Sequence, residues 1–268
     1  MEIIEKRITL ENIEKPLVII PLGDVHYGNI NVDIMKFKET IEYIRTKENC
    51  YAVLMGDTCD AIMISDKRFD IESITPELRS KIGDLGMAQY TNMRNMLMPI
   101  KDKILASVDG NHGTTLYQKY HCDYDAWLAR ELGIPDLGTS GFLIIKFDRA
   151  QFHTETVTIY MHHGYVAGRL SGNKLNAMDR LRSSYDADVF LMGHSHDIFV
   201  KSYLKISPAG TKIKNKKQYV AQTGSFLQTL IQGTTSYAEI AGYPPQKTGC
   251  VKIEIYPSNK NVDIHLSE

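Results

Sequence analysis

Five short apolar runs in the chain each end in glycine or in polar residues. In chain order they are PLVIIPLG, YAVLMG, KILASVDG, VTIYM and DVFLMG. Runs of this length that are rich in Val, Ile and Leu and bounded by glycine predict buried strands. We therefore expect five strands, each followed by a polar loop at its carboxyl end.

The segments between these runs carry apolar residues at helical spacing. In residues 31–48 the apolar positions recur every three or four residues, which predicts an amphipathic helix. The same spacing predicts helices over residues 122–133, where Gly133 ends the pattern, and over residues 174–188. Strands that alternate with helices favour a parallel sheet.

Residues 61–100 interrupt this alternation as an insertion that is rich in methionine and helical in its pattern, most clearly over residues 87–100. Methionines at helical spacing usually pack in a core. A cap over a binding site and a surface for a partner remain open alternatives for this insertion.

The last quarter of the chain has the pattern of antiparallel strands separated by turns. The segments concerned are residues 197–206, 216–224 and 247–256, and they predict a second sheet. Because no repeat, linker or low-complexity tract divides the chain, we expect residues 1–268 to form a single domain.

The composition, with 43% hydrophobic and 24% charged residues, is that of an ordinary soluble globular protein. The first residues mix acids and bases before any apolar run, so neither a signal peptide nor a membrane partner is expected. The four cysteines are widely spaced and form no CxxC pair, which disfavours a disulfide framework or a thiolate zinc site. A cytoplasmic location fits these features best.

The net charge of −1 provides no global field to attract nucleic acid or membranes. One stretch without any Asp or Glu nevertheless contains Lys201, Lys205, Lys212, Lys214, Lys216 and Lys217. We interpret it as a solvated hairpin in preference to an edge that binds polyanions, because a run of charges alone is weak evidence for a ligand.

Polar residues with metal-binding side chains follow all five predicted strands. They are Asp24, His26, Asp57, Asp60, Asn111, His112, His162, His163, His194 and His196. A single His-x-His pair would more simply be part of a surface turn, but six of the nine histidines fall in these motifs. Ligands in open α/β sheets gather beyond the carboxyl ends of the strands, so we expect these side chains to share one pocket.

Oxygen and imidazole ligands without thiolates suit manganese, iron, zinc or nickel. The candidate ligands outnumber what one ion binds, which favours two divalent ions about 3.5–4 Å apart and bridged by a carboxylate. Such a pair serves hydrolysis by activating water and by neutralising a phosphoryl group.

The motifs GDVH, GDTCD, GNHG, HHG and GHSH, in this order over residues 23–196, resemble those of the calcineurin-like metallophosphoesterase superfamily. The resemblance implies an α/β fold in which two sheets form an α/β/β/α sandwich. It also implies a binuclear centre, with manganese preferred and iron, zinc or nickel as alternatives.

By position, the resemblance implies two sets of metal ligands that share Asp57. The first set is Asp24, His26, Asp57 and His196, and the second is Asp57, Asn111, His163 and His194. His163 is preferred to His162 because the ligand of the family directly precedes its glycine. His162 would then support the site or lie at the lip of the pocket.

The resemblance also implies that His112 binds no metal and acts as the general acid toward the leaving oxygen. Asp60 would orient His112, with a helix or turn cap as its alternative role. The expected reaction is hydrolysis of a phosphodiester by a hydroxide that bridges the two metals. Cys59 is better explained as a small buried hydrophobic residue than as a nucleophile.

The chain departs from the protein phosphatases of the family, because GDTCDAI and GNHGT lack their arginine and glutamate. GDVHYG, with Gly28, looks closer to the phosphodiesterase and nuclease branches. Gly113 stands where acids are common in the family, which removes one possible support for His112.

The substrate stays open among nucleotides, nucleic acids and other diesters. Tyr27, Tyr165, Arg169 and the lysine stretch are candidates for contacting it, without assigned roles. A phosphomonoesterase or nucleotidase and a non-catalytic interaction module of the same fold are the alternative functions. Self-association is possible but has no direct support in the sequence.

Overall fold

The computed structural model describes residues 1–9, 15–149, 153–166, 170–231, 239, 242–256 and 261–266. Its strands form two sheets. Sheet I contains, in spatial order, β1 (Glu2–Ile8), β5 (Ser140–Arg149), β6 (His153–His162), β7 (Val189–Met192), β9 (Lys212–Ser225) and β8 (Ile198–Ala209). Sheet II contains β11 (Asn261–Leu266), β10 (Gly249–Tyr256), β2 (Leu17–Leu22), β3 (Cys50–Leu54) and β4 (Ile104–Ser107).

The two sheets are continuous at one edge and pack face to face beyond it. At the edge, Gly224 and Ser225 of β9 pair with Cys250 and Gly249 of β10. Beyond it, side chains from both sheets form one apolar cluster, to which β3 contributes Val53 and β7 contributes Leu191. This cluster is the core of a sandwich.

Alternation along the strands explains why both faces of each sheet are apolar. Leu17 and Ile19 of β2 belong to the core between the sheets, whereas Val18, Ile20 and Leu22 face the other way into a second cluster. Successive side chains of a strand point to opposite faces, so a strand buried on both faces needs an unbroken apolar run. The five runs of the sequence meet this need.

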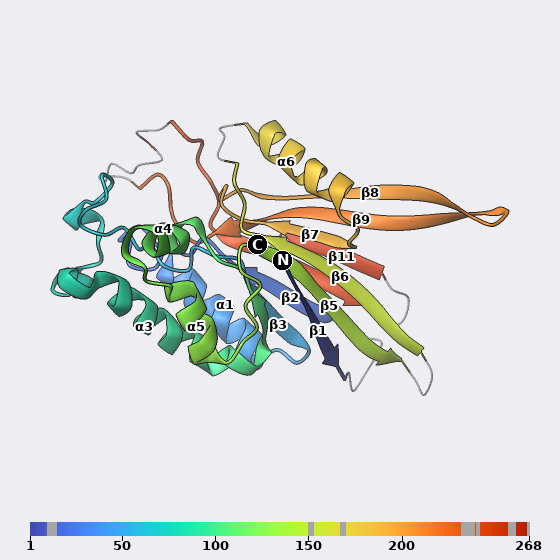
Figure 1. Ribbon diagram of the computed structural model, residues 1–268, viewed down its shortest axis with the longest axis horizontal. Coiled ribbons are helices and arrows are strands. Elements are labelled where there is room, and N and C mark those ends of the chain that lie inside the picture. Colours follow the sequence, from blue (N-terminus) through green and yellow to red (C-terminus); the bar gives the residue numbers. More distant parts are fainter. Residues whose placement is uncertain are drawn as a thin grey trace.

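Helices cover the outer faces of the sandwich (Figure 1). Those packed on sheet II are α1 (Ile34–Thr46), α3 (Leu85–Leu97), α4 (Asn111–Tyr120) and α5 (Tyr124–Leu132). On sheet I, Ala177 and Met178 of α6 (Ser171–Ser184) pack against Phe190 of β7. The order helix, sheet, sheet, helix confirms the expected α/β/β/α sandwich.

The predicted helices are found as α1, α5 and α6. Asp33 accepts a hydrogen bond from the Lys36 N–H at the start of α1, and Gly133, with a φ of 68°, ends α5. The strands β1, β5 and β11 and the helix α4 were not predicted from the sequence. β1 and α4 have a weak apolar pattern, since β1 buries only Ile8 fully and α4 buries Leu116 as its one large apolar side chain. β5, in contrast, contains an apolar run at residues 142–145 that the five runs do not include.

The insertion at residues 61–100 consists of short helices around α3. These are η1 (Ile71–Ser73), α2 (Pro76–Arg79), η2 (Ile82–Asp84) and the start of η3 (Met98–Lys103). Met93 is fully buried in the cluster on sheet II, and Met96 and Met98 pack partly against it. These three methionines therefore serve the core.

The lysine stretch lies on a long antiparallel hairpin of β8 and β9. Its pairing runs from Ile198 and Thr223 to Ala209 and Lys212, and the tip extends beyond the rest of the molecule (Figure 1). Over the described part of the chain, we find no helix with the length and apolar character needed to span a membrane.

Candidate metal centre

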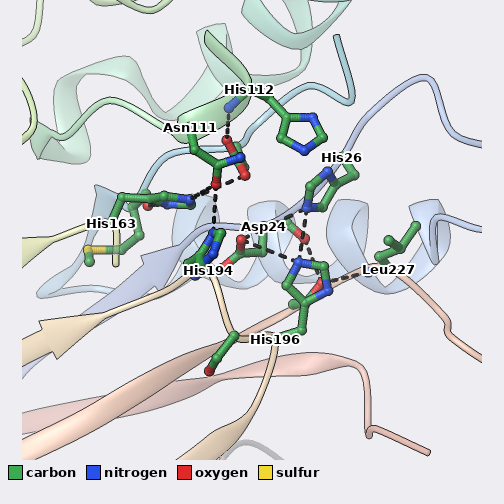
Figure 2. A network of polar contacts seen from close by, with 12 residues as sticks. Asp24, His26, Asn111, His112, His163, His194, His196 and Leu227 are labelled. Carbon is green, nitrogen blue, oxygen red and sulfur yellow. Dashed lines mark hydrogen bonds and ion pairs between the residues drawn. The ribbon is translucent and has the colours of Figure 1, made fainter. Parts of the chain in front are cut away.

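All five motifs lie in loops at the carboxyl ends of strands. The loops after β2, β3 and β4 belong to sheet II, and those after β6 and β7 belong to sheet I. Backbone hydrogen bonds join neighbouring loops: Asp24 N–H donates to the Gly56 carbonyl at 3.1 Å, and Gly193 N–H donates to the His163 carbonyl at 2.8 Å. Side chains from the loops after β2, β4, β6 and β7 consequently meet beyond the carboxyl ends of the strands (Figure 2).

Five of the motif residues have left-handed backbone conformations. Their φ angles are 48° at Asp24, 52° at His26, 46° at Asp57, 66° at His194 and 59° at His196. This region is unfavourable for residues other than glycine, and such strain clusters at functional sites. Each of these loops turns sharply at a residue whose side chain enters the centre.

The first ligand group consists of Asp24, His26 and His196, whose candidate atoms lie within 4.8 Å of one another. His26 Nε2 lies 3.1 Å from His196 Nε2, and Asp24 Oδ1 lies 3.5 Å from His196 Nε2. Asp24 Oδ2 accepts a hydrogen bond from His194 N–H at 2.8 Å. Asp24 Oδ1, however, is buried without a hydrogen-bond partner among the described residues.

The second ligand group consists of Asp57, His163 and His194. His163 Nε2 lies 3.2 Å from Asp57 Oδ2, while His163 Nδ1 faces the Met55 carbonyl at 2.7 Å. The hydrogen bond to this carbonyl fixes the plane of the ring, so that Nε2 faces the site. Asp57 Oδ1 accepts a hydrogen bond from the His112 N–H at 2.9 Å.

The Asn111 amide lies between the histidines of the second group. Its Oδ1 is 2.9 Å from His163 Nε2 and 2.7 Å from His194 Nδ1. In this orientation the oxygen faces only acceptors, and turning the amide would let its NH₂ donate to both rings and to Asp57. In either orientation the Asn111 side chain contacts both rings of the second group.

Protonation of the histidines follows from their burial and their neighbours. Burial, with the charge of His163, lowers the pKa of His194 to about 4, and burial with the charge of His26 lowers the pKa of His196. Burial also acts to lower the pKa of His163, but the charge of Asp57 and its hydrogen bond to the ring outweigh this effect and raise the pKa to about 10. His194 and His196 are thus neutral, whereas His163 exchanges its proton for a metal on binding.

These donors fit divalent metal ions. Each group combines a carboxylate with two imidazoles, and both groups lack a thiolate, which suits manganese, iron, zinc or nickel. A cation explains the buried oxygen of Asp24 that has no hydrogen-bond partner among the described residues. The sequence-predicted ligands are therefore brought together, in two groups, by loops from both sheets.

His112 and Asp60 lie beside the first group. His112 Nδ1 is hydrogen-bonded to the main-chain carbonyl of Asp60, which directs Nε2 away from it. The Asp60 carboxylate instead faces His26, with Oδ1 3.3 Å from His26 Nδ1, and its Oδ2 accepts from Asn29 Nδ2 at 3.3 Å. Asp60 contacts His112 with its carbonyl and not with the expected carboxylate.

His26, Asp60 and His112 also form a third group of potential metal ligands. This group shares His26 with the first ligand group, so the two could not use the same nitrogen at once. His26 presents Nε2 to His196 and Nδ1 to Asp60. Its ring therefore connects the first group to the residues that support His112.

His162 is turned away from the ligand groups. Its Nδ1 accepts a hydrogen bond from the Gly164 N–H at 2.8 Å, and burial together with the charge of His163 lowers its pKa. Tyr165 is exposed beside it, with 5.6 Å between the ring centroids.

Of the other candidates for contacting a substrate, Tyr27 is buried, and its hydroxyl accepts a hydrogen bond from Asn92. Arg169 lies outside the described residues.

Glycines permit close packing around the start of α4. A Cβ at Gly110 would overlap the carboxylate of Asp57, and one at Gly113 would overlap the carboxylate of Asp125. Asp125 accepts hydrogen bonds from Gly110 N–H at 3.1 Å and from Tyr90 Oη at 2.8 Å. An acid from α5 thus fills the space that the glycine at position 113 leaves open.

Three further residues support the centre although no motif identified them. Asp125 binds the first turn of α4, and buried Lys174 of α6 pairs with Asp197 at 2.6 Å beside His196. Arg68, in the insertion, brings Nη1 within 3.5 Å of His112 Nε2. Their contacts depend on how distant segments pack, which leaves no local pattern in the sequence.

A two-sheet sandwich with Asp, Asn and His at the carboxyl ends of strands from both sheets has the architecture expected for a calcineurin-like metallophosphoesterase. No protein-family model matches the chain, and no curated protein matches it. Solved structures do match, at low identity.

One similar structure is Vps29 from Entamoeba histolytica in complex with Zn²⁺. It has a TM-score of 0.41 and 12% identity, and the match covers 92% of this chain and 97% of that chain. A metallophosphoesterase from Sphaerobacter thermophilus has a TM-score of 0.40 and 13% identity, with 94% and 88% covered. A predicted phosphoesterase from Streptococcus pneumoniae has a TM-score of 0.39 and 15% identity, with 93% and 88% covered.

Proposed function

We propose that this protein is a phosphoesterase with two divalent metal ions, preferably manganese, and that it hydrolyses a phosphodiester. The observation that carries the proposal is the meeting of two buried ligand groups beside an imidazole, His112, whose Nδ1 is held by a carbonyl and whose ring contacts that of His26. A purely structural site would not need a buried carboxylate oxygen, Asp24 Oδ1, that has no hydrogen-bond partner among the described residues.

The ligands of the first ion would be Asp24, His26 and His196, and those of the second would be Asn111, His163 and His194. Asp57 would belong to both. Two such ions lower the pKa of bound water and neutralise negative charge on a phosphoryl group.

The protein positions the substrate through the first turn of α4. Asn111 and His112 are its first residues, and the N-terminus of a helix favours the negative charge of a phosphoryl group. Since the His112 N–H is bonded to Asp57, the helix is fixed to the loop after β3. The phosphoryl group would lie between this helix and the two ligand groups.

His112 would protonate the leaving oxygen. Its Nδ1–H donates to the Asp60 carbonyl, which fixes the plane of the ring and leaves Nε2 to carry the proton that is transferred. Asp60 would act twice, because its carboxylate also holds the ring of His26. We propose Asp60 as a positioning residue on these grounds.

The preference for a diester rests on the sequence, which lacks the arginine and glutamate motifs of the protein phosphatases. Hydrolysis of a monoester or nucleotide is the alternative for the same centre. A non-catalytic interaction module would have no use for His112 beside two complete ligand groups.

The test is metal-dependent hydrolysis of two model esters. The protein is stripped with chelator, reloaded with Mn²⁺ and assayed with bis(p-nitrophenyl) phosphate and p-nitrophenyl phosphate. We expect faster cleavage of the diester, and a loss of about 10²-fold or more in His112→Ala with two metals per chain retained. His121→Asn, an exposed histidine at the end of the same helix, is the matched control.

The acid role predicts a dependence on the leaving group. Diphenyl phosphate has a poorer leaving group than the nitrophenyl diester, so His112→Ala should slow its cleavage by a larger factor. Equal losses for both diesters would exclude proton transfer by His112. No turnover of any ester despite two bound metals per chain would reject the phosphoesterase proposal.

A further inference from the structure

Arg68 is held beside the candidate centre by a two-point contact with Asp66. Arg68 Nε lies 3.1 Å from Asp66 Oδ1, and Nη2 lies 3.1 Å from Asp66 Oδ2. The Arg68 N–H also donates to Asp66 Oδ1 at 3.0 Å, and Lys119 Nζ lies 3.5 Å from Oδ2. The hydrogen bonds from Arg68 lower the pKa of Asp66, which therefore stays ionised.

This contact leaves Nη1 of the guanidinium group free of Asp66 and hydrogen-bonded to His112. Nη1 is the nitrogen that Asp66 does not bind, and it lies 3.5 Å from His112 Nε2. That is the same nitrogen that faces the ligand groups, because His112 Nδ1 is bonded to Asp60. The donors of Arg68 and His112 therefore converge at one edge of the centre.

Arg45 of α1 forms the same two-point contact, with Glu42, on an exposed helix face. Arg68 differs because its remaining donor points to the proposed general acid. A neighbouring cation disfavours protonation of an imidazole, unless an anion binds to both groups.

We propose that Arg68 binds a non-bridging oxygen of the phosphoryl group of the substrate. The inference rests on the proposed phosphoesterase function and assigns it a substrate-binding residue from the insertion. Two donors at this separation fit neighbouring oxygens of one phosphoryl group, so that His112 faces the ester oxygen while Arg68 binds the oxygen beside it. Planar guanidinium groups with fixed orientation are well suited to phosphate.

Asp66 is the positioning residue for this contact. In Asp66→Asn an amide replaces the carboxylate. The guanidinium group of Arg68 would then lose the negative charge that orients it, although Arg68 itself would remain. Arg68→Lys would keep the charge but not the geometry, because an ammonium group cannot contact Asp66 at two points and still reach the site.

The test is the binding of inorganic phosphate to the Mn²⁺-loaded protein, measured by isothermal titration calorimetry. We expect Arg68→Gln to weaken phosphate binding about tenfold or more, because it removes a hydrogen bond between charged groups. Asp66→Asn should give a smaller loss. Arg45→Gln is the matched control and should bind phosphate as the unmodified protein does, and bound metal should remain unchanged in all variants.

Turnover of bis(p-nitrophenyl) phosphate in the same samples separates the two proposals. Unmodified protein that binds phosphate through Arg68 but hydrolyses no ester would support the phosphate site and reject the enzymatic function. Active protein whose phosphate affinity and KM are unchanged in Arg68→Gln would reject the role of Arg68 alone. Failure of the unmodified loaded protein to bind phosphate would also overturn the inference.

Discussion

Gly113 illustrates how one residue determines the packing beneath the candidate centre. The position is helical, where alanine would normally be favoured over glycine. The carboxylate of Asp125 nevertheless occupies the volume that a Cβ would need. The glycine is thus required by a side chain from a neighbouring helix and not by its own backbone angles.

Gly113→Ala should destabilise the protein by about 1–2 kcal/mol, since overpacking outweighs the gain in helix propensity. Gly172→Ala in α6, where nothing lies within 4 Å of the new Cβ, should be neutral or slightly stabilising. Urea denaturation of the two variants makes the comparison. Similar stability changes in both would show that Asp125 moves aside without cost.

The Asp125 carboxyl predicts a dependence of stability on pH. Burial raises its pKa from 3.8 to about 7, despite hydrogen bonds from Tyr90 and Gly110 that favour the ionised form. The folded protein therefore binds this proton more tightly than the unfolded chain does. Its contribution to stability is complete below about pH 4 and is lost as the pH rises through about 7.

Asp125→Asn removes this titration and retains partners for the Gly110 N–H and the Tyr90 hydroxyl. We expect the variant to match the unmodified protein at pH 4 and below and to exceed its unfolding free energy by a margin on the order of 3 kcal/mol at pH 8. Denaturation curves at several pH values, in chelator, measure the difference. A difference in unfolding free energy between the two proteins that stays constant with pH would contradict the raised pKa of Asp125.

Residue types and their order in the motifs were sufficient to predict which side chains meet. Asp24, Asp57, Asn111, His163 and His196 are all found in the cluster, because carboxyl ends of strands share an edge. The contact of the Asp60 carbonyl with His112 and the position of Arg68 depend on the paths of loops, including left-handed residues such as Ala61, with a φ of 52°. No spacing rule predicts these paths.

Among the elements, α6 fixes the loop that carries His194 and His196. Lys174 of α6 is only 1% exposed, and its ammonium group lies 2.6 Å from Asp197 Oδ2. Gln246 Nε2 donates to the other oxygen, Oδ1, at 3.2 Å. A buried charge pair that loses one member leaves the other with a desolvation cost.

Lys174→Met should lower the unfolding free energy by about 2–3 kcal/mol and weaken metal binding about tenfold, because the loop loses its attachment to α6. Lys174→Met with Asp197→Asn should be less destabilised than Lys174→Met alone. Lys216→Met, which breaks more exposed contacts with Asp186 and Asp188, should cost at most about 0.5 kcal/mol. Denaturation and metal titration of these variants test the expectation.

The elements differ in how far the sequence predicts them. The strands β2, β3 and β7 have long apolar runs because both of their faces are covered. In contrast, β1 alternates exposed and half-buried residues along its length, and its place beside β5 is decided by tertiary pairing. A strand of this kind has no apolar run from which it could be predicted.

At the scale of the whole molecule, the β8–β9 hairpin is remote from the centre beyond its first residues. Leu204, Ile206 and Ile213 are exposed on it, by 61%, 63% and 73%. The strands pair Lys205 with Lys216 and turn at Gly210 and Thr211. Removing four residues from each strand therefore preserves the pairing and the turn.

The shortened chain, in which residues 206–209 and 212–215 are deleted, should fold and retain two metals. Its turnover of small phosphoesters should stay within about twofold, since deletions at an exposed hairpin tip remove few buried contacts. Thermal denaturation, metal content and the model-ester assay provide the measurement. A large loss of turnover with unchanged metal content would show that the hairpin tip contributes to the reaction.

Each ligand group contains residues from both sheets, so metal binding should stabilise the whole sandwich. Free Mn²⁺ at a hundredfold excess over Kd adds about 2.7 kcal/mol per site if the unfolded chain does not bind it. Urea denaturation in Mn²⁺ and in chelator should differ accordingly. Equal midpoints would show that the metals do not bind across the sheets.

The order of the ligands along the chain has a consequence for biosynthesis. A growing chain that ends before His163 already contains Asp24, His26, Asp57 and Asn111, but neither ligand group is complete in it. Only after His196 has been made and sheet I has docked on sheet II can both groups form. Full metal affinity would therefore mark a finished tertiary structure, so that in newly made protein the candidate centre is assembled last.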